Sequence, residues 1–289
     1  MKRLTHFLSL VKFSHSIFAL PFALQGAWLA QRGVPGWRVL VWIVVCAVAA
    51  RTAAMAFNRL VDRHIDADNP RTAQRELPAG ILGSSSVTVM VLLSCAVFIA
   101  AAFQLNDLAG KLSVPVLLVL LGYSFVKRFS FLAHAVLGLA LAIAPLGAWI
   151  AVRGEIGAGV ATVLWLAGAV WTWVAGFDLI YACQDAEFDA SRGLHSVPAR
   201  FGVAAALRVS TLLHVVTVAC LGLTAWSGDL GVIYWISIGF AAALLAWEHG
   251  LVKPDDLSRV DVAFFTLNGW VGISLFVGLA LDFGVRGAA

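Results

Sequence analysis

Two stretches of the sequence place carboxylate side chains at helical spacing. In the first, Asn58, Asp62 and Asp66 recur every four residues, a step that turns only about 40° around an α-helix, so all three side chains share one face. Pro70 disfavours helical backbone at the residue before it, which predicts that the helix ends there. The first group of carboxylates therefore belongs to the last turns of a helix.

The second stretch contains Asp178, Asp185 and Asp189, which are separated by seven and four residues. On a continuous helix these positions fall within about 20° on either side of a common direction, so they again share a face. Glu187 falls on the opposite side of that helix, and we exclude it from the group. The sequence thus predicts two co-facial sets of carboxylates.

Carboxylates at the C-terminal end of a helix need a cation, because the helix dipole is negative there and the side chains repel one another. Solvated salt bridges with nearby arginines are one source of positive charge. Mg²⁺ is the other, since it prefers oxygen ligands, takes one or two carboxylates and completes its shell with phosphate oxygens. Two sets on the same membrane side favour Mg²⁺ with a diphosphate bridged between them. The predicted metal ligands are Asn58, Asp62, Asp66, Asp178, Asp185 and Asp189, and the predicted catalytic residues are Asp62, Asp66, Asp185 and Asp189.

Basic residues supply the second half of the predicted site. Guanidinium groups match phosphate oxygens with paired hydrogen bonds, which makes Arg71 and Arg75 candidates for binding the diphosphate. Lys127 and Arg128 add positive charge from another loop. Arg51 lies inside an apolar stretch, seven residues before the first motif and on nearly the same face. A charged residue within a membrane span is a functional candidate, so we include Arg51 among the substrate-binding residues.

The elements that must position these residues are transmembrane helices. The chain has 289 residues, of which 61% are hydrophobic and 12% charged, against roughly 25% charged in an ordinary soluble domain. Apolar stretches long enough to cross a bilayer core of about 30 Å recur along the whole sequence, and none is confined to a cleavable signal pattern. We therefore expect an all-α polytopic membrane protein, a single domain over residues 1–289 with about nine helices around a central cavity. The expected spans begin at Ser16, Arg38, Ser85, Leu112, Phe131, Gly159, Ala205, Leu230 and Val260.

The distribution of Lys and Arg predicts the orientation of these spans. Most of these residues fall in loops on one side of the expected bundle, which the positive-inside rule assigns to the cytoplasm. The two polar segments that carry the carboxylates, 59–84 and 185–202, lie on that side. Because the basic residues occupy short loops rather than a run, the formal net charge of +4 indicates topology and not nucleic-acid binding. We expect a multi-pass protein of the cell inner (plasma) membrane with its active-site loops in the cytoplasm.

Other features limit the alternative functions. The four cysteines lie in apolar segments without a CxxC pair, so neither a disulfide framework nor a zinc site is predicted. A secondary transporter also has polytopic helices and charged residues inside the membrane. Transporters, however, favour broken helices with sites near the midplane, whereas the charges here gather at one face. A non-catalytic membrane scaffold has no need of two co-facial aspartate sets.

At these motifs the sequence resembles the UbiA-type membrane prenyltransferases. That family is marked by an Asn-x3-Asp-x3-Asp motif, here 58–66, and by a Tyr-Ala pair followed by Asp-x3-Asp, here 181–189. The segments 71–80 and 123–128 and the nine-helix layout extend the likeness over nearly the whole chain. The resemblance implies Mg²⁺-dependent transfer of a polyprenyl group from polyprenyl diphosphate to an aromatic acid.

A closer resemblance predicts the acceptor. Members that prenylate 4-hydroxybenzoate tend to carry Lys where this chain has His195, and the segments 12–16, 53–58 and 193–202 are similar to the menaquinone-pathway branch. This likeness implies 1,4-dihydroxy-6-naphthoate, in the futalosine route, as the acceptor. The alternative is 4-hydroxybenzoate, in ubiquinone biosynthesis.

The resemblance also implies roles near the reacting atoms. An allylic cation must be shielded from water, and an apolar cavity does this while it also houses the prenyl tail. Tyr181 is expected to stabilise the cation through its ring face, and Lys12 is expected to bind the acceptor. Asn58 and Asp178 are expected to stand beside the four catalytic aspartates as further ligands or as neighbours that contact the substrate. No base for the ring proton is predicted.

Overall fold

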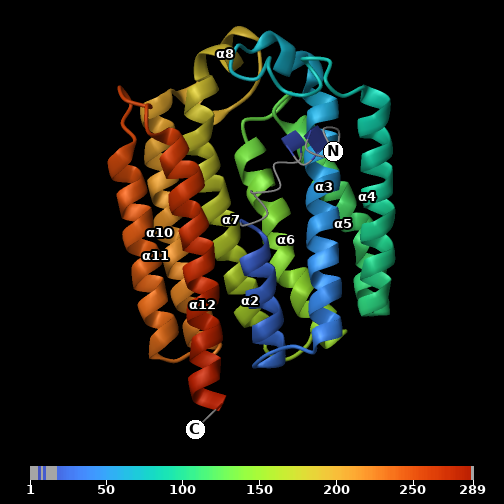
Figure 1. The fold of residues 1–289 in the computed structure, drawn as a ribbon. Coiled ribbons are helices and arrows are strands. Elements are labelled where there is room, and N and C mark those ends of the chain that lie inside the picture. Colours follow the sequence, from blue (N-terminus) through green and yellow to red (C-terminus); the bar gives the residue numbers. More distant parts are fainter. Residues whose placement is uncertain (1–5, 8, 11–17, 288–289) are drawn as a thin grey trace.

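Long helices make up most of the structure, which is a computed structural model that describes residues 6–7, 9–10 and 18–287. Figure 1 shows these helices side by side as a bundle, with short helices and loops at one end. The described part of the chain contains no β-strand. The long helices are α2 (Leu20–Gln31), α3 (Trp37–Asp68), α4 (Ser84–Leu105), α5 (Asp107–Val126), α6 (Ala133–Arg153), α7 (Val160–Ala182), α10 (Val203–Ser227), α11 (Val232–Leu251) and α12 (Asn268–Gly287). The short elements are η2 (Cys183–Asp185), α8 (Ala186–Ser191), α9 (Val197–Phe201) and η3 (Val262–Leu267).

Among the described residues, 8 helices are long and apolar enough to cross a membrane, namely α3 to α6, α7 with its extension, and α10 to α12 with η3. The helix α2 is apolar but has only 12 residues, and the expected start of its span at Ser16 lies outside the described residues. The chain as a whole has a mean hydropathy of +0.90. These helices confirm the prediction of an all-α polytopic membrane protein.

The expected start of α5 was wrong by more than one helical turn. This helix begins at Asp107 rather than at Leu112. The side chain of Asn106 accepts a hydrogen bond from the backbone N–H of Ala109 at 2.9 Å and so caps the helix. Because Asp107 and Lys111 are polar, this first turn does not stand out as an apolar stretch in the sequence.

The first carboxylate motif lies at the end of α3, as predicted. This helix of 32 residues ends at Asp68, and Asn69 is extended before Pro70, with φ −91° and ψ 118°. Asp62 and Asp66 are buried in the last turns of the helix. The end of α3 therefore holds two carboxylates inside the protein rather than in solvent.

The second motif spans a break in the helix that we did not predict. α7 ends at Ala182, the 3₁₀ turn η2 contains Asp185, and α8 carries Asp189. The sequence has no Gly or Pro at this point. Instead, side chains of Asn69 and Arg71, from the segment after α3, bind the carboxylate of Asp185. The prediction of a continuous helix was wrong, because contacts with a distant segment cannot be inferred from the spacing of neighbouring residues.

Both polar segments lie at the same end of the bundle. In Figure 1, α8 and the segment that joins α3 to α4 lie together at the top of the view. The loop before α9 also contacts the loop after α5, since the backbone N–H of His195 donates to the carbonyl of Lys127 at 2.7 Å. Three loops that are far apart in the sequence thus form one end of the molecule.

Small residues allow the helices below these loops to approach closely. A Cβ atom added at Gly26 of α2 would lie 2.2 Å from the backbone oxygen of Pro145 in α6. One added at Gly138 of α6 would lie 2.4 Å from the backbone oxygen of Trp171 in α7. Close backbone contact of this kind is a usual basis of helix packing in membranes. The helix α6 is therefore held tightly between α2 and α7.

A π-helical turn, η3, precedes α12 and is tied to two other helices. The side-chain amide of Asn268 donates to the backbone oxygen of Ala263 at 3.0 Å and to Oε1 of Glu248 at 2.9 Å. Its oxygen accepts from the indole N–H of Trp173 at 2.6 Å. Glu248 and Asn268 are both fully buried. This network connects η3, which includes Phe264, to α7 and α11.

Candidate active site

A cavity of about 740 Å³ lies where the two carboxylate motifs meet. Its walls come from α3, α5, α6, α7 and η3 and from the segments after α3 and α7. Among the predicted site residues, Arg128 contacts a cavity residue without lining the cavity, and Lys12 lies outside the described residues. Glu187 is exposed and does not line the cavity, which agrees with its exclusion. The predicted residues that line the cavity are Arg51, Asn58, Asp62, Asp66, Arg71, Arg75, Lys127, Asp178, Tyr181, Asp185 and Asp189.

Asp62 is a buried carboxylate held between two cations. Its oxygens lie 2.6 Å from Nζ of Lys127 and 2.8 Å from Nη2 of Arg128, and it also accepts from the amide of Asn58 at 3.2 Å. The side chain of Asp62 is 3% exposed, whereas those of Lys127 and Arg128 are 32% and 31% exposed. Hydrogen bonds between two charged groups are stronger than neutral ones. The two cations therefore balance Asp62 while they remain open to solvent.

Asp66 lies one turn further along α3. Its Oδ1 accepts a hydrogen bond from Arg75 at 2.7 Å, and Nη1 of Arg59 lies 3.8 Å from Oδ2. This Oδ2 atom is buried and accepts no hydrogen bond from the described residues. Because a buried acceptor without a hydrogen bond is unfavourable, Asp66 has one oxygen to offer to a ligand.

Asp185 binds the guanidinium group of Arg71 with both oxygens. Nε of Arg71 lies 2.9 Å from Oδ1, Nη2 binds Oδ2, and Asn69 adds a hydrogen bond of 3.0 Å. Nη1 of Arg71 donates to the hydroxyl of Tyr181 at 2.8 Å, and the guanidinium carbon lies 5.1 Å from the centre of that ring. Burial alone would lower the pKa of Arg71, but its hydrogen bonds with Asp185 and Tyr181 raise it above the ordinary value. Arg71 is therefore a permanent cation beside the second motif.

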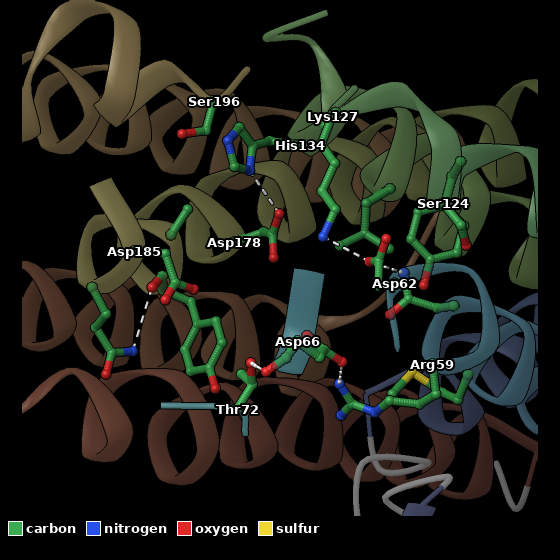
Figure 2. Close-up of a pocket in the computed structure, with 18 of the residues that line it drawn as sticks. Arg59, Asp62, Asp66, Thr72, Ser124, Lys127, His134, Asp178, Asp185 and Ser196 are labelled. Carbon is green, nitrogen blue, oxygen red and sulfur yellow. Dashed lines mark hydrogen bonds and ion pairs between the residues drawn. The ribbon is translucent and has the colours of Figure 1, made fainter. Parts of the chain in front are cut away.

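Asp178 contacts a histidine that the sequence analysis did not single out. Its Oδ2 lies 2.7 Å from Nδ1 of His134 in α6. Figure 2 shows Asp178 between this histidine and the space that Asp62, Asp66 and Asp185 surround. The contact arises from the packing of α6 against α7, and a lone histidine near the start of an apolar stretch has no spacing that could reveal it.

Polar atoms that make no hydrogen bond gather on the α3 and α5 side of the cavity. Nε of Arg51, Nε of Arg59 and Oγ of Ser124 are buried and have no hydrogen-bond partner among the described residues. Arg51 also forms no ion pair with a described carboxylate. Buried N–H and O–H groups that make no hydrogen bond suit an anionic or polar ligand, because such groups are unfavourable when they stay unsatisfied. Arg59 and Ser124 were not predicted, since neither belongs to a spaced motif.

The donor atoms of the cavity suit a hard divalent cation. Carboxylates from α3, from η2 and from α8 line the same space, and Oδ2 of Asp66 is available. No three His, Cys, Asp or Glu side chains in the described chain stand close enough to form a metal centre by themselves. Mg²⁺ requires only one or two carboxylates and completes its shell with water and phosphate oxygens, so the residues fit it. The salt bridges considered from the sequence are also present, since Asp62, Asp66 and Asp185 each pair with a basic side chain.

Aromatic rings form the wall of the cavity next to Tyr181. The centre of the Phe264 ring lies 4.3 Å from that of Tyr181, 5.2 Å from that of Phe177 and 5.7 Å from that of Phe18. These four side chains all line the cavity. Rings at these distances form favourable pairs and present a continuous apolar surface. The cavity therefore combines a charged part with an aromatic part.

Comparison with known proteins identifies the family and the fold. Residues 19–270 match the model of the UbiA prenyltransferase family. A 4-hydroxybenzoate octaprenyltransferase from Acidovorax ebreus is 34% identical over 270 residues, which cover 91% of this chain and 89% of the relative. The apo structure of a UbiA homolog from Aeropyrum pernix K1 is 34% identical, with a TM-score of 0.84 over 93% of this chain and 98% of that one.

A more distant structure shares the fold. A UbiA homolog from Archaeoglobus fulgidus bound to GPP and Mg²⁺ is 17% identical, with a TM-score of 0.72 over 96% of this chain and 99% of that one. The family match and the relatives confirm the prediction of an aromatic prenyltransferase and leave no support for a transporter or a scaffold. This chain belongs to the UbiA prenyltransferase family.

Proposed function

We propose that this chain transfers a polyprenyl group from a polyprenyl diphosphate to an aromatic acid in quinone biosynthesis. The observation that carries the proposal is the composition of the cavity, in which carboxylates and basic side chains stand next to a wall of aromatic rings. The charged part suits a diphosphate, and the aromatic part suits an isoprenoid chain. One prenyltransferase domain would then extend over residues 1–289.

The basic side chains are the groups that would bind the diphosphate. Arg71, Arg75, Lys127 and Arg128 pair with motif carboxylates through contacts of 2.6 to 2.9 Å. Phosphate oxygens accept hydrogen bonds from guanidinium and ammonium groups, as carboxylate oxygens do. These cations can therefore exchange a motif carboxylate for the diphosphate. Tyr181 and Phe264 would face the allylic cation and keep water from it.

Mg²⁺ is the cofactor that we propose. Asp62, Asp66, Asp185 and Asp189 would hold it, with Asn58 and Asp178 beside them. The ion would supply Lewis-acid stabilisation of the negative charge on the departing diphosphate. Support comes from the buried oxygen of Asp66 that accepts no hydrogen bond from the described residues, and from the Archaeoglobus fulgidus homolog, which was solved with GPP and Mg²⁺.

The acceptor with the stronger support is 4-hydroxybenzoate. The similar proteins from Acidovorax ebreus and Pseudomonas fluorescens are both named 4-hydroxybenzoate octaprenyltransferase. The expectation of 1,4-dihydroxy-6-naphthoate depends on short likenesses at 12–16, at 53–58 and around His195. This residue lines the cavity, and its buried Nδ1 has no partner among the described residues. His195 therefore lies in the cavity wall whichever acid is the acceptor, so its position does not decide between them. We keep 1,4-dihydroxy-6-naphthoate as the second candidate.

A direct competition tests both the reaction and the acceptor. Purified protein in lipid nanodiscs is given Mg²⁺, a polyprenyl diphosphate and equal concentrations of the two acids, and the products are identified by mass spectrometry. We expect prenylated 4-hydroxybenzoate to dominate and the Asp185→Ala variant to form none. A product from the naphthoate alone would reverse the choice of acceptor, and no product from either acid would refute the proposed function.

We also propose that the active-site end of the bundle faces the cytoplasm. Exposed Ser258 lies in the loop after α11, and exposed Ser227 lies at the opposite end of α10. In intact cells an impermeant maleimide should label Ser227→Cys, and it should label Ser258→Cys only after the membrane is permeabilised. The reverse pattern would place the site on the outer face.

A further inference from the structure

A second cavity, about 590 Å³ in volume, lies between α6, α7 and α10. Figure 1 shows α7 between the other two helices. Among the described residues that line this cavity, only His134 also lines the active cavity, so the two spaces have different walls. We call the second cavity the α7 groove.

The wall of the α7 groove is apolar apart from two side chains. Exposed Phe201, Leu132 and Trp171 contribute large apolar surfaces. The two polar residues of the wall, His134 and Thr172, already contact oxygen atoms of α7. An empty groove lacks the dispersion contacts of a close-packed interior, and a hydrocarbon chain would supply them. The groove therefore suits a hydrocarbon chain.

The groove is nearly as long as one leaflet of a bilayer is thick. On α7 its wall extends from Leu179 to Trp171, and on α10 from Ala205 to Leu213, which is eight residues on each helix. At 1.5 Å per residue this is about 12 Å, against about 15 Å for half of a 30 Å hydrocarbon core. Leu179 and Ala205 lie near the loops at the active-site end, where α7 ends and α10 begins. The groove therefore lies within the leaflet at that end.

A cation stands at the loop end of the groove. The guanidinium carbon of Arg200, in α9, lies 5.0 Å from the centre of the Phe131 ring and 5.4 Å from that of the Phe201 ring. Both rings line the groove. The side chain of Arg200 is exposed and makes no ion pair or hydrogen bond with a described residue. Because no carboxylate balances it, Arg200 is available to an anion at the level of the lipid headgroups.

An isoprenoid chain is the other hydrocarbon ligand to consider. The anionic group of a polyprenyl diphosphate is the diphosphate, and the side chains that suit a diphosphate line the active cavity instead. A phospholipid joins an acyl chain to one phosphate, as the groove joins an apolar wall to one arginine. Basic sites between transmembrane helices commonly bind anionic headgroups. The phospholipid is therefore the better match.

We propose that the α7 groove binds one acyl chain of an anionic phospholipid, with Arg200 at the phosphate of its headgroup. The inference does not depend on the proposed function, because the groove and the active cavity have different walls. The bound chain would fill the space between α6, α7 and α10 in the leaflet at the active-site end.

Photolabelling measures binding at the groove itself. The probe is phosphatidylglycerol with a diazirine near the end of one acyl chain, added to the purified protein in detergent micelles. After irradiation and proteolysis, mass spectrometry should find the label on peptides that contain Trp171 or Leu213, at the deep end of the groove. Unlabelled phosphatidylglycerol should displace the probe at an about fivefold lower concentration than phosphatidylcholine with the same chains, as for one arginine near an anionic headgroup. Inorganic phosphate, which has no chain, should not displace it.

Two substitutions with the same change of charge separate Arg200 from the other cations. Arg200→Gln should reduce the preference for phosphatidylglycerol to less than about twofold, because the amide is neutral. Arg208→Gln is the matched control and should keep the fivefold preference. Arg208 is exposed on α10, and its guanidinium group donates to the carbonyl of Ala204 at 3.2 Å rather than lying over the rings of the groove. Ala205→Trp, which places a large ring in the groove, should reduce labelling of both peptides at least about tenfold.

The opposite results would overturn the inference. Label confined to other helices would place the lipid elsewhere, and equal displacement by the two phospholipids, or an equal loss of preference in Arg208→Gln, would remove the role of Arg200. Displacement by a polyprenyl diphosphate at a lower concentration than by phosphatidylglycerol would assign the groove to an isoprenoid chain. If Arg200→Gln does not fold, the labelled positions and the order of displacement in the wild type still decide. None of these results bears on transfer to an aromatic acid, which the competition between the two acids tests.

Discussion

The substitution Asp62→Asn removes one charge from the centre of the cavity while it keeps the shape of the side chain. In the native protein the two oxygens of Asp62 balance Lys127 at 2.6 Å and Arg128 at 2.8 Å. An amide oxygen can still accept a hydrogen bond, but it brings no negative charge. The two cations then face each other without a counter-ion, and one candidate metal ligand is lost.

The structure allows an estimate of the cost in stability. A hydrogen bond to a charged group contributes about 1.5 to 3 kcal/mol and a neutral one about 1 kcal/mol, so two weakened bonds cost about 1 to 4 kcal/mol. Because Lys127 and Arg128 are 32% and 31% exposed, water replaces part of the interaction. We expect a loss of about 2 kcal/mol. With an unfolding entropy of about 2.1 cal/mol/K per residue over the 289 residues, the Tm falls by about 3 °C.

The expected loss of activity is larger than the loss of stability. We expect kcat/KM to fall at least about 100-fold, or ~2.7 kcal/mol, because the missing charge acts where the diphosphate and its cation would bind. Thermal unfolding of the purified protein and a transfer assay at saturating Mg²⁺ measure the two effects separately. Glu187→Gln is the control, since Glu187 is exposed and outside the cavity. Near wild-type transfer by Asp62→Asn, or an equal loss in the control, would contradict the assignment of this carboxylate.

Three further outcomes are expected. Arg51→Ala should raise the KM for polyprenyl diphosphate or lower kcat by about tenfold in steady-state kinetics. Arg51→Lys should restore only part of the lost activity, because an ammonium group cannot replace the planar guanidinium group. Unchanged kinetics in Arg51→Ala would leave Arg51 a structural role. Asp189→Asn should lose transfer in the same assay in which Glu187→Gln keeps it, and similar losses in both would show that the two side chains do not face different surroundings. Removal of divalent cations with a chelator should abolish transfer, and added Mg²⁺ should restore it, whereas full activity in the chelator would exclude a role for the ion.

Local patterns in the sequence were sufficient for much of the fold. Long apolar stretches predicted the spans. With the last span counted from Val262 of η3, seven of the eight that can be compared begin within two residues of the expected position. The four-residue spacing of Asp62 and Asp66 predicted their common face, because helical periodicity is a property of neighbouring residues. The end of α3 just before Pro70 followed from a local steric rule. Each of these features depends on residues close together in the chain.

The features that the sequence did not predict depend on contacts between distant segments. The break at η2 accompanies the binding of Asp185 by Arg71, and these residues are 114 positions apart. The contact of His134 with Asp178 joins residues 44 positions apart on two packed helices. Lys127 and Arg128 were expected near the diphosphate, but their pairing with one buried aspartate could not be inferred from spacing. A single sequence carries no signal of such pairs until the helices are placed together.

The π-helical turn η3 makes the cavity sensitive to the number of residues in one short segment. A π turn holds one residue more than an α turn, which rotates the residues before it by about 100° relative to those after it. The removal of one residue from 262–267 would leave the span as apolar as before. With Asn268 held by Trp173 and Glu248, Phe264 would then turn away from Tyr181. Two chains with the same motifs and the same hydropathy can therefore differ in the shape of the cavity wall, because that shape depends on a count of residues rather than on their type.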